Sequence, residues 1–316
     1  MNIIRLYNQN RKQIFQVIFI IASVIFAIQF ANYLVKKSNE KNLNSEINSS
    51  STLGTTTINQ SQQSAISSSS VSNKTYKEQS ELIDNFIKYC NEGNAQKAYE
   101  LLSANCKEVM FPTLEYFINN YVKVVFSENR IYSIKNWTGS TYKVSITENI
   151  LATGKYNNGV AIEDYFTIVT ENGKNRLNIN SFISRTSSTK KASNNGLDLE
   201  VLYKDTYMDY VIFTVKASNK TDKIISLDSG KSTQNMYIVD NNSVKYLSAR
   251  NEILGANLRV LPNSENTVEI KYYSSYVSTK TINSMIFNDI ILDLSTYEST
   301  NSKEDYTGRI SIKIEL

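Results

Sequence analysis

An uncharged apolar run near the N-terminus restricts this chain more than any other feature. Residues 14–35 read IFQVIFIIASVIFAIQFANYLV, which is 22 residues without a charge. A helix rises about 1.5 Å per residue, so the run spans about 33 Å, enough for a hydrocarbon core about 30 Å thick. A cleaved signal peptide is the alternative, but the run is longer than a usual h-region and no A-x-A cleavage site follows it. We therefore predict a permanent transmembrane helix over 14–35.

The charges beside this helix do not decide its orientation. Three basic residues precede it and three follow it closely, namely Arg5, Arg11, Lys12, Lys36, Lys37 and Lys41. The positive-inside rule therefore gives a tie. Residues 36–76 are rich in Ser, Thr, Asn and Gln and cannot bury a core, which predicts a disordered stalk. Because such stalks commonly lift domains off an outer surface, we expect 1–13 to be a cytoplasmic tail and the C-terminal domains to be extracellular.

Composition removes several classes of function. The chain contains no histidine, which excludes Ser-His-Asp and Cys-His catalysis and His-ligated zinc. Residues 77–186 hold twelve basic and twelve acidic residues, and 187–316 hold fifteen and sixteen, so the basic excess lies around the anchor. Neither region offers the clustered Lys and Arg that a phosphate backbone requires. We expect no nucleic-acid partner, no cofactor, no metal and no enzymatic activity.

The segment 77–186 changes from helical to strand periodicity. Apolar residues at helical spacing predict three helices, with Gly93 as a C-terminal cap of the first and Thr113 as the N-cap of the third. Four strand-like runs follow at 130–137, 141–151, 161–171 and 174–184, with Asn172-Gly173 as a hairpin signal between the last two. This order predicts an α+β domain in which three helices pack on one face of a curved antiparallel sheet.

This order of elements, together with FIKYCNEGNAQKAYELLSANCKE and the later FINNYVKVVF, resembles the nuclear-transport-factor-2-like superfamily of cone-shaped domains. The resemblance rests on pattern and not on a signature motif. It implies a cone whose interior serves catalysis in some members, whereas many members only bind or scaffold. The fold therefore does not decide the function.

Two sets of side chains are candidates for the interior of this cone. Aromatic residues that could line a pocket for an apolar ligand are Phe86, Tyr89, Phe117, Tyr121 and Trp137. Aromatic residues at helical spacing are more often core. The ionisable candidates, besides Tyr89, are Asp84, Glu163 and Asp164. Asp84 falls between apolar helix positions and is most simply solvated, and adjacent strand residues point to opposite faces, so the acids are not expected to pair.

Cys90 and Cys106 are the chain's two thiols, and the sequence allows two interpretations of their state. Neither stands beside a basic cluster that would lower its pKa, so two half-buried, unreactive thiols are the preferred reading. A Cys90–Cys106 disulfide is the alternative, because both residues lie near the ends of neighbouring predicted helices and the outside of a cell can be oxidising.

After a short polar hinge at 187–195, residues 196–316 show strand periodicity. Leu197, Leu199, Val201 and Tyr203 alternate with less apolar residues, and about eight such runs are separated by turn signals. This predicts an all-β two-sheet sandwich. Asp240, with two following asparagines, has the composition of a calcium loop but no following bidentate Glu, so a hairpin turn is predicted there.

The segments DYVIFTVKASNKTDKIISLD, MYIVDNNSVKY and LPNSENTVEIKYY resemble the immunoglobulin-like domains of Gram-positive lipoproteins and other surface-anchored proteins. Paired cysteines and a core tryptophan, as in antibody domains, are missing, so only the sandwich carries over. Together, the anchor and the two resemblances imply a membrane-anchored extracytoplasmic binding or scaffolding protein of the cell envelope, with a protein or envelope partner. A subunit of a conjugation or secretion apparatus is a special case. The alternative is a small-molecule sensor that uses the cavity of the cone.

Overall fold

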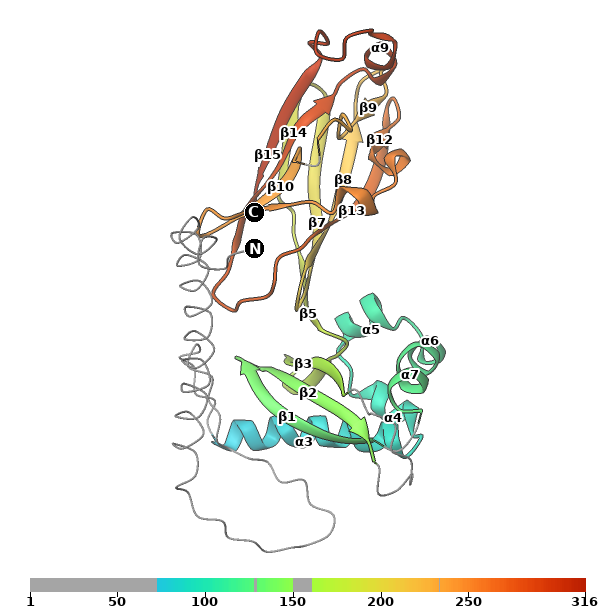
Figure 1. Ribbon diagram of the computed structural model, residues 1–316, viewed down its shortest axis with the longest axis vertical. Helices are drawn as coiled ribbons and strands as arrows, with labels where there is room; N and C mark the ends of the chain where they lie inside the picture. The colour runs from blue at the N-terminus through green and yellow to red at the C-terminus, as the bar shows by residue number, and fades with distance from the viewer. Residues whose placement is uncertain (1–72, 128–129, 150–160, 233) are drawn as a thin grey trace, which may run out of the picture. The chain divides into compact units, whose positions relative to one another are not determined.

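The computed structural model describes residues 73–127, 130–149, 161–232 and 234–316 (Figure 1). The predicted tail, anchor and all but the last four residues of the predicted stalk lie outside these ranges. Residues 73–76, placed in the stalk from the sequence, are instead the start of a helix. Within the described ranges, no helix is both long and apolar enough to cross a membrane.

The described chain begins with a group of helices that pack against a four-stranded sheet. The helical elements are α3 (Asn73–Asn91), α4 (Ala95–Glu100), α5 (Ala104–Met110), α6 (Leu114–Phe117), a π-helical turn η1 (Ile118–Val122) and α7 (Lys123–Val125). Two predicted end signals are confirmed. Gly93 has a positive φ of 72° just after α3, and the Thr113 side chain accepts the N–H of Tyr116 at 3.1 Å. The three predicted helices did not include α5 as a separate helix. Ser103 caps it by accepting the N–H of Cys106.

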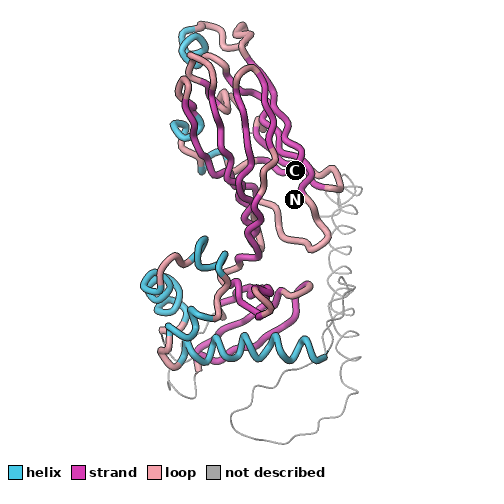
Figure 2. The backbone as a smooth tube through the Cα atoms, turned by 180° about the vertical axis from the view of Figure 1, so that it is seen from behind, coloured by secondary structure: helices cyan, strands magenta, loops and turns pink. Residues whose placement is uncertain are grey.

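The sheet is an antiparallel meander, as predicted. Its strands lie in the order β1 (Arg130–Thr138), β2 (Thr141–Glu148), β3 (Ile162–Glu171) and β4 (Lys174–Asn178). Asn172 and Gly173 both have positive φ in the β3–β4 hairpin, which confirms the turn signal. Tyr142 and Phe166, on β2 and β3, are fully buried against the helices. Figure 2 shows most of the helix packed beside this sheet, and strands with only short helical segments in the rest of the described chain.

Two further antiparallel sheets enclose a second core, which confirms the predicted β-sandwich. One sheet contains β5 (Phe182–Ser187), β6 (Lys191–Asn194), β7 (Leu197–Tyr207), β8 (Val211–Asn219) and β13 (Ser264–Tyr272). The other contains β9 (Ile225–Ser226), β10 (Met236–Asp240), β11 (Lys245–Leu247), β12 (Arg259–Val260), β14 (Ile282–Ile291) and β15 (Arg309–Glu315). Phe213, Tyr272 and Phe287 meet in the core between them.

Short helical elements interrupt the sandwich, and the sequence did not predict them. They are two 3₁₀ turns, η2 (Arg250–Glu252) and η3 (Gly255–Leu258), and the helix α9 (Leu294–Ser299). Asp293 caps α9 by accepting the N–H of Thr296 at 3.0 Å.

The predicted hinge at 187–195 is wrong, because most of it is strand. Ser187 ends β5, and Lys191–Asn194 forms β6, which pairs with β7 in the register Lys191↔Glu200. The run 174–184, predicted as one strand, is split by Asn180 and Ser181, which both have positive φ. Its second part, β5, pairs with β7 and so joins the sandwich sheet. These strands were not predicted because most of their side chains are polar and show no apolar period. Their pairing depends on backbone hydrogen bonds to the neighbouring strand.

One buried asparagine links two segments of the sandwich, the turn after β8 and the end of β12. The amide nitrogen of Asn219, a residue that is 2% exposed, donates to the carbonyl oxygens of Lys223 at 2.7 Å, Leu261 at 3.0 Å and Val260 at 3.2 Å. Its side-chain oxygen accepts the N–H of Thr221 at 2.9 Å. The predicted turn after β8 therefore depends on the amide of Asn219.

We predict that Asn219→Asp lowers the free energy of unfolding by about 2–3 kcal/mol, because a carboxylate cannot donate to the three carbonyl oxygens, whose bonds to Asn219 are buried or part-buried. Urea unfolding measures the change. The matched control is Asn266→Asp, since the Asn266 amide also donates to two carbonyl oxygens, but in solvent-exposed bonds. An equal loss in both variants would contradict the importance of burial at Asn219.

Candidate functional site

The interior of the α+β unit contains three of the five predicted aromatic residues. Phe86 on α3, Phe117 on α6 and Tyr121 on η1 are all at most 2% exposed. Their ring centroids lie 5.8–6.3 Å apart, with Phe111 and Phe166 packed against them at 5.3–5.6 Å. These are ordinary separations for rings in direct contact. The rings are therefore packed against one another as a core.

The other two predicted lining residues lie elsewhere. Trp137 is 39% exposed and contacts Tyr165, because alternation along β1 directs it away from the helices. Tyr89 is half-buried near the end of α3, where the Lys97 ammonium lies 5.5 Å from its ring centroid. Trp137 is therefore outside the core, whereas Tyr89 packs against the core while remaining partly buried.

A buried carboxylate adjoins this aromatic core. Asp164 on β3 accepts the Tyr121 hydroxyl at 2.8 Å and the backbone N–H groups of Tyr165, Asn180 and Ser181 at 2.7–3.0 Å. Burial raises the pKa of Asp164, and these four donors oppose the rise. Asn180 and Ser181 have positive φ, so the carboxylate holds a strained turn between β4 and β5.

The other acidic candidates have separate partners. Glu163 lies on the opposite face of β3, as alternation predicts, and pairs with Lys143 at 2.7 Å. Asp84 is half-buried and accepts the Tyr132 hydroxyl at 2.6 Å, so the prediction that it is simply solvated is wrong. Burial raises the pKa of Asp84. The three acids are thus held in three different surroundings.

Cys90 and Cys106 are both free thiols, which corrects the disulfide alternative. Each is at most 2% exposed, so the prediction of half-burial is also corrected. Cys90 lies near the end of α3 and Cys106 within α5, and each packs into the core on its own helix. Burial raises the pKa of Cys106 to about 12 and raises that of Cys90 further.

Arg185 on β5 forms an interaction that the sequence analysis missed. Its Nε and Nη2 each donate at 2.7 Å to one carboxylate oxygen of Asp205 on β7, and its Nη1 donates to Glu108 on α5 at 2.8 Å. The guanidinium also lies 4.6 Å from the ring centroid of Tyr203. The hydrogen bonds with Asp205 keep the pKa of Arg185 above its ordinary value. Asp205 is buried, and its place in the series Leu197, Leu199, Val201, Tyr203 signalled an acid on a core-facing column.

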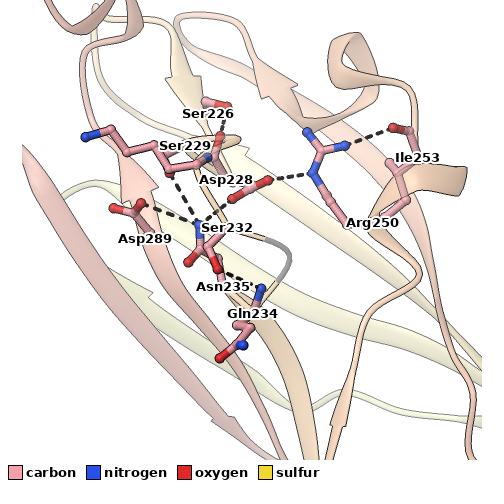
Figure 3. A network of polar contacts seen from close by, with 10 residues as sticks. Ser226, Asp228, Ser229, Ser232, Gln234, Asn235, Arg250, Ile253 and Asp289 are labelled. Carbon is pink, nitrogen blue, oxygen red and sulfur yellow. Dashed lines mark hydrogen bonds and ion pairs between the residues drawn. The ribbon is translucent and has the colours of Figure 1, made fainter. Parts of the chain in front are cut away.

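A second charged network stabilises loops of the sandwich (Figure 3). Asp228 is buried, accepts the Arg250 Nε, and accepts the Asn235 side-chain amide at 2.8 Å. The same amide reaches Asp289 at 3.5 Å, and Asp289 pairs with Arg309 at 2.6 Å. Two carboxylates are thus neutralised by two guanidinium groups. The network links the loop before β10 to η2 and to strands β14 and β15.

Nothing in the described ranges gathers three or more Cys, Asp or Glu side chains into a metal-binding group. Asp240, considered as a calcium ligand, instead closes its own hairpin. It accepts the N–H groups of Asn242 and Val244, both at 2.9 Å, and the Tyr246 hydroxyl at 3.0 Å. The predicted turn is confirmed.

β1 is an edge strand among the described strands of its sheet, and two large apolar side chains are exposed on it. Its exposed residues form a column on the sheet face away from the helices, namely Ile131, Ser133, Lys135 and Trp137. Ile131 is 50% exposed and Trp137 39%. By contrast, the exposed residues of β13 include Glu265 and Glu269, charges that discourage added strands. We call the column of four residues the β1 column.

Comparisons with known proteins give little guidance. No protein-family model matches the chain, and no curated protein matches it in sequence. The yjhA protein from Bacillus subtilis is similar over 41% of this chain and 98% of its own, at 16% identity and a TM-score of 0.28. A functionally unknown protein from Listeria monocytogenes EGD-e is similar over 42% of this chain and 87% of its own, at 8% identity and a TM-score of 0.26. At these scores the similarity decides neither fold nor function.

We predict that Asp164→Asn lowers the free energy of unfolding by about 2–4 kcal/mol, because its amide group would face a buried N–H donor. Tyr121→Phe removes a single donor and is expected to cost only about 1–2 kcal/mol. Urea unfolding of both variants provides the comparison. If Asp164→Asn proves the milder change, the ionised carboxylate is not what holds the turn.

We also predict that neither cysteine reacts with a thiol reagent at pH 8 in the folded protein. A thiol with a pKa of about 12, as at Cys106, is almost entirely protonated at that pH, and the thiolate is the reactive form. Both thiols should react once the protein is unfolded in denaturant without reductant. Prompt reaction of the folded protein would refute their burial, and no reaction after unfolding would reveal a disulfide.

Proposed function

We propose that this chain is a membrane-anchored, extracytoplasmic binding or scaffolding protein of the cell envelope. In this proposal the α+β unit is a nuclear-transport-factor-2-like domain and the sandwich an immunoglobulin-like domain. Helices followed by a four-stranded meander support the first assignment, and two facing antiparallel sheets support the second. The apolar run at 14–35 supports the anchor.

The observation that carries the proposal is that the buried carboxylates are bonded to groups of the protein itself. Among the described residues the buried acids are Asp164, Asp205, Asp228 and Asp240. Each is occupied by bonds that hold the fold: Asp164 by a strained turn, Asp205 by Arg185, Asp228 by Arg250 and Asn235, and Asp240 by its own hairpin. A general base must instead be free to take a proton from a substrate. These four acids therefore stabilise the fold. We infer that the protein acts by binding a partner through its surface.

The alternative function, a small-molecule sensor, has less support. It requires space between the aromatic residues of the α+β interior. Phe86, Phe117 and Tyr121 instead contact one another and are buried to at least 98%. A ligand would have to displace packed rings, which costs cavity and contact energy before any binding is gained.

Within an envelope, a subunit of a conjugation or secretion apparatus is the special case that we favour. Such a subunit needs folded surfaces held near a membrane and no chemistry of its own. Tethering raises the local concentration of both domains, so a weak contact can be occupied.

We predict that protease added to intact cells releases a fragment of the full-length protein that begins between Asn42 and Ser72, because the predicted stalk should lie outside the cell and ends where α3 begins. Replacing 14–35 by an unrelated transmembrane helix should leave both this release and the partner captured by in-cell crosslinking unchanged. A cytoplasmic protein serves as the control for cell integrity.

Protection of the fragment until the cells are lysed would reverse the orientation. Loss of the partner with the foreign helix would place binding in the membrane segment and would refute the role given to the folded domains.

A further inference from the structure

The connection between β14 and β15 folds around the side chain of Lys303. It contains α9 and the segment 300–308, which we call the strap, and it lies at the end of the sandwich where Figure 1 labels α9. A small apolar cluster is buried there, made of Ile291, Leu294, Tyr297 and Tyr306. Tyr306 belongs to the strap, and its hydroxyl accepts the N–H of Asp293 at 2.8 Å. The strap therefore forms part of the wall of this cluster.

The Lys303 ammonium is bonded to three carbonyl oxygens at the end of α9. Its Nζ donates to the carbonyl oxygens of Tyr297 and Glu298, both at 2.7 Å, and to that of Thr300 at 2.8 Å. The last carbonyl groups of a helix lack the usual intrahelical partner, and the helix dipole favours a cation beside them. An ammonium group has three N–H donors. The three oxygens therefore match the three donors of one ammonium group.

A ring and a second cation complete the surroundings of this ammonium. The centroid of the Tyr297 ring lies 5.2 Å from the Lys303 Nζ, within the range of a cation–π contact. The carbonyl oxygen of Lys303 accepts the Arg309 Nη2 at 2.7 Å, and the Nη1 of the same residue donates to Asp289 at 2.6 Å. In the described part of the chain, no carboxylate lies within salt-bridge distance of Lys303. Carbonyl dipoles and a ring thus hold its charge, as they would hold a small bound cation.

We propose that the end of α9 is a binding site for a primary ammonium group, which the chain fills with its own Lys303 and so holds the strap closed. The site selects for N–H donors, because its ligands are three carbonyl oxygens. When the ammonium leaves, the strap loses three charge-assisted hydrogen bonds and opens, which uncovers the rings of Tyr297 and Tyr306. This inference concerns the sandwich alone and does not depend on the proposed function.

Truncation followed by chemical rescue tests the site in the full-length chain. Lys303→Ala removes the side chain beyond Cβ, a piece equivalent to n-propylammonium. We expect hydrogen–deuterium exchange of the backbone amides at 292–308 to become about tenfold faster, because hydrogen bonds to a charged group are lost. Adding n-propylammonium chloride should restore slow exchange. Tetramethylammonium chloride at the same concentration should not, since it has no N–H donor.

Three controls separate the ammonium from the carbon chain and from global stability. Lys303→Met keeps an unbranched apolar side chain without the ammonium and should exchange as fast as Lys303→Ala. Lys245→Met removes an exposed lysine whose ammonium lies 3.7 Å from the Tyr237 ring centroid, and it should leave exchange at 292–308 unchanged. Exchange of the amides in β7 and β8 reports global unfolding.

Three results would overturn the proposal. The first is exchange of the strap in Lys303→Met as slow as in the natural chain, or acceleration by Lys245→Met as large as by Lys303→Met. The second is that n-propylammonium restores no more protection than tetramethylammonium. The third is acceleration in β7 and β8 by the same factor as in the strap, because Lys303 would then stabilise the whole fold and not hold one segment closed.

Discussion

The pairing of β5 with β7 is the constraint on which the rest of the described structure depends. β5 begins at Phe182, a residue of the α+β core, and its partner β7 begins at Leu197, a residue of the sandwich core. Arg185 closes this pairing with a bidentate bond to a carboxylate that has almost no access to water. Removing Arg185 would leave the buried carboxylate of Asp205 uncompensated, which in proteins typically costs about 3–5 kcal/mol. Neither core is independent of this strand pair.

Three further buried carboxylates hold a loop or turn in a similar way. Asp164, Asp228 and Asp240 each gather donors from a loop or turn that the hydrophobic effect alone would leave undefined. Apolar burial is not directional, whereas a carboxylate with several donors specifies one geometry. These acids are candidates for catalysis when only the sequence is considered. In the structure they instead fix the backbone geometry of the turns.

Periodicity predicted most of the regular elements because it records burial directly. The helix after Thr113, the hairpin at Asn172-Gly173 and the alternation from Leu197 onward each show their buried face in the sequence. β6 was missed because Lys191–Asn194 contains one small apolar residue, Ala192, which is too little to show a strand period. Trp137 was misplaced because aromatic character does not say which face of a strand a residue takes. Arg185 and Asp228 were missed since their charged partners lie 20 or more residues away in the chain.

Tyr207 shows what a shared strand pair means for folding. It lies at the end of β7, yet it packs in the α+β core, edge-on to Phe182 and stacked on Tyr210. During synthesis from the N-terminus, the first core therefore stays incomplete until the first long strand of the sandwich has emerged. The chain therefore cannot be divided between the α+β unit and the sandwich without exposing core residues of one of them. We expect thermal unfolding of the described residues to be one cooperative event, with the two cores lost together.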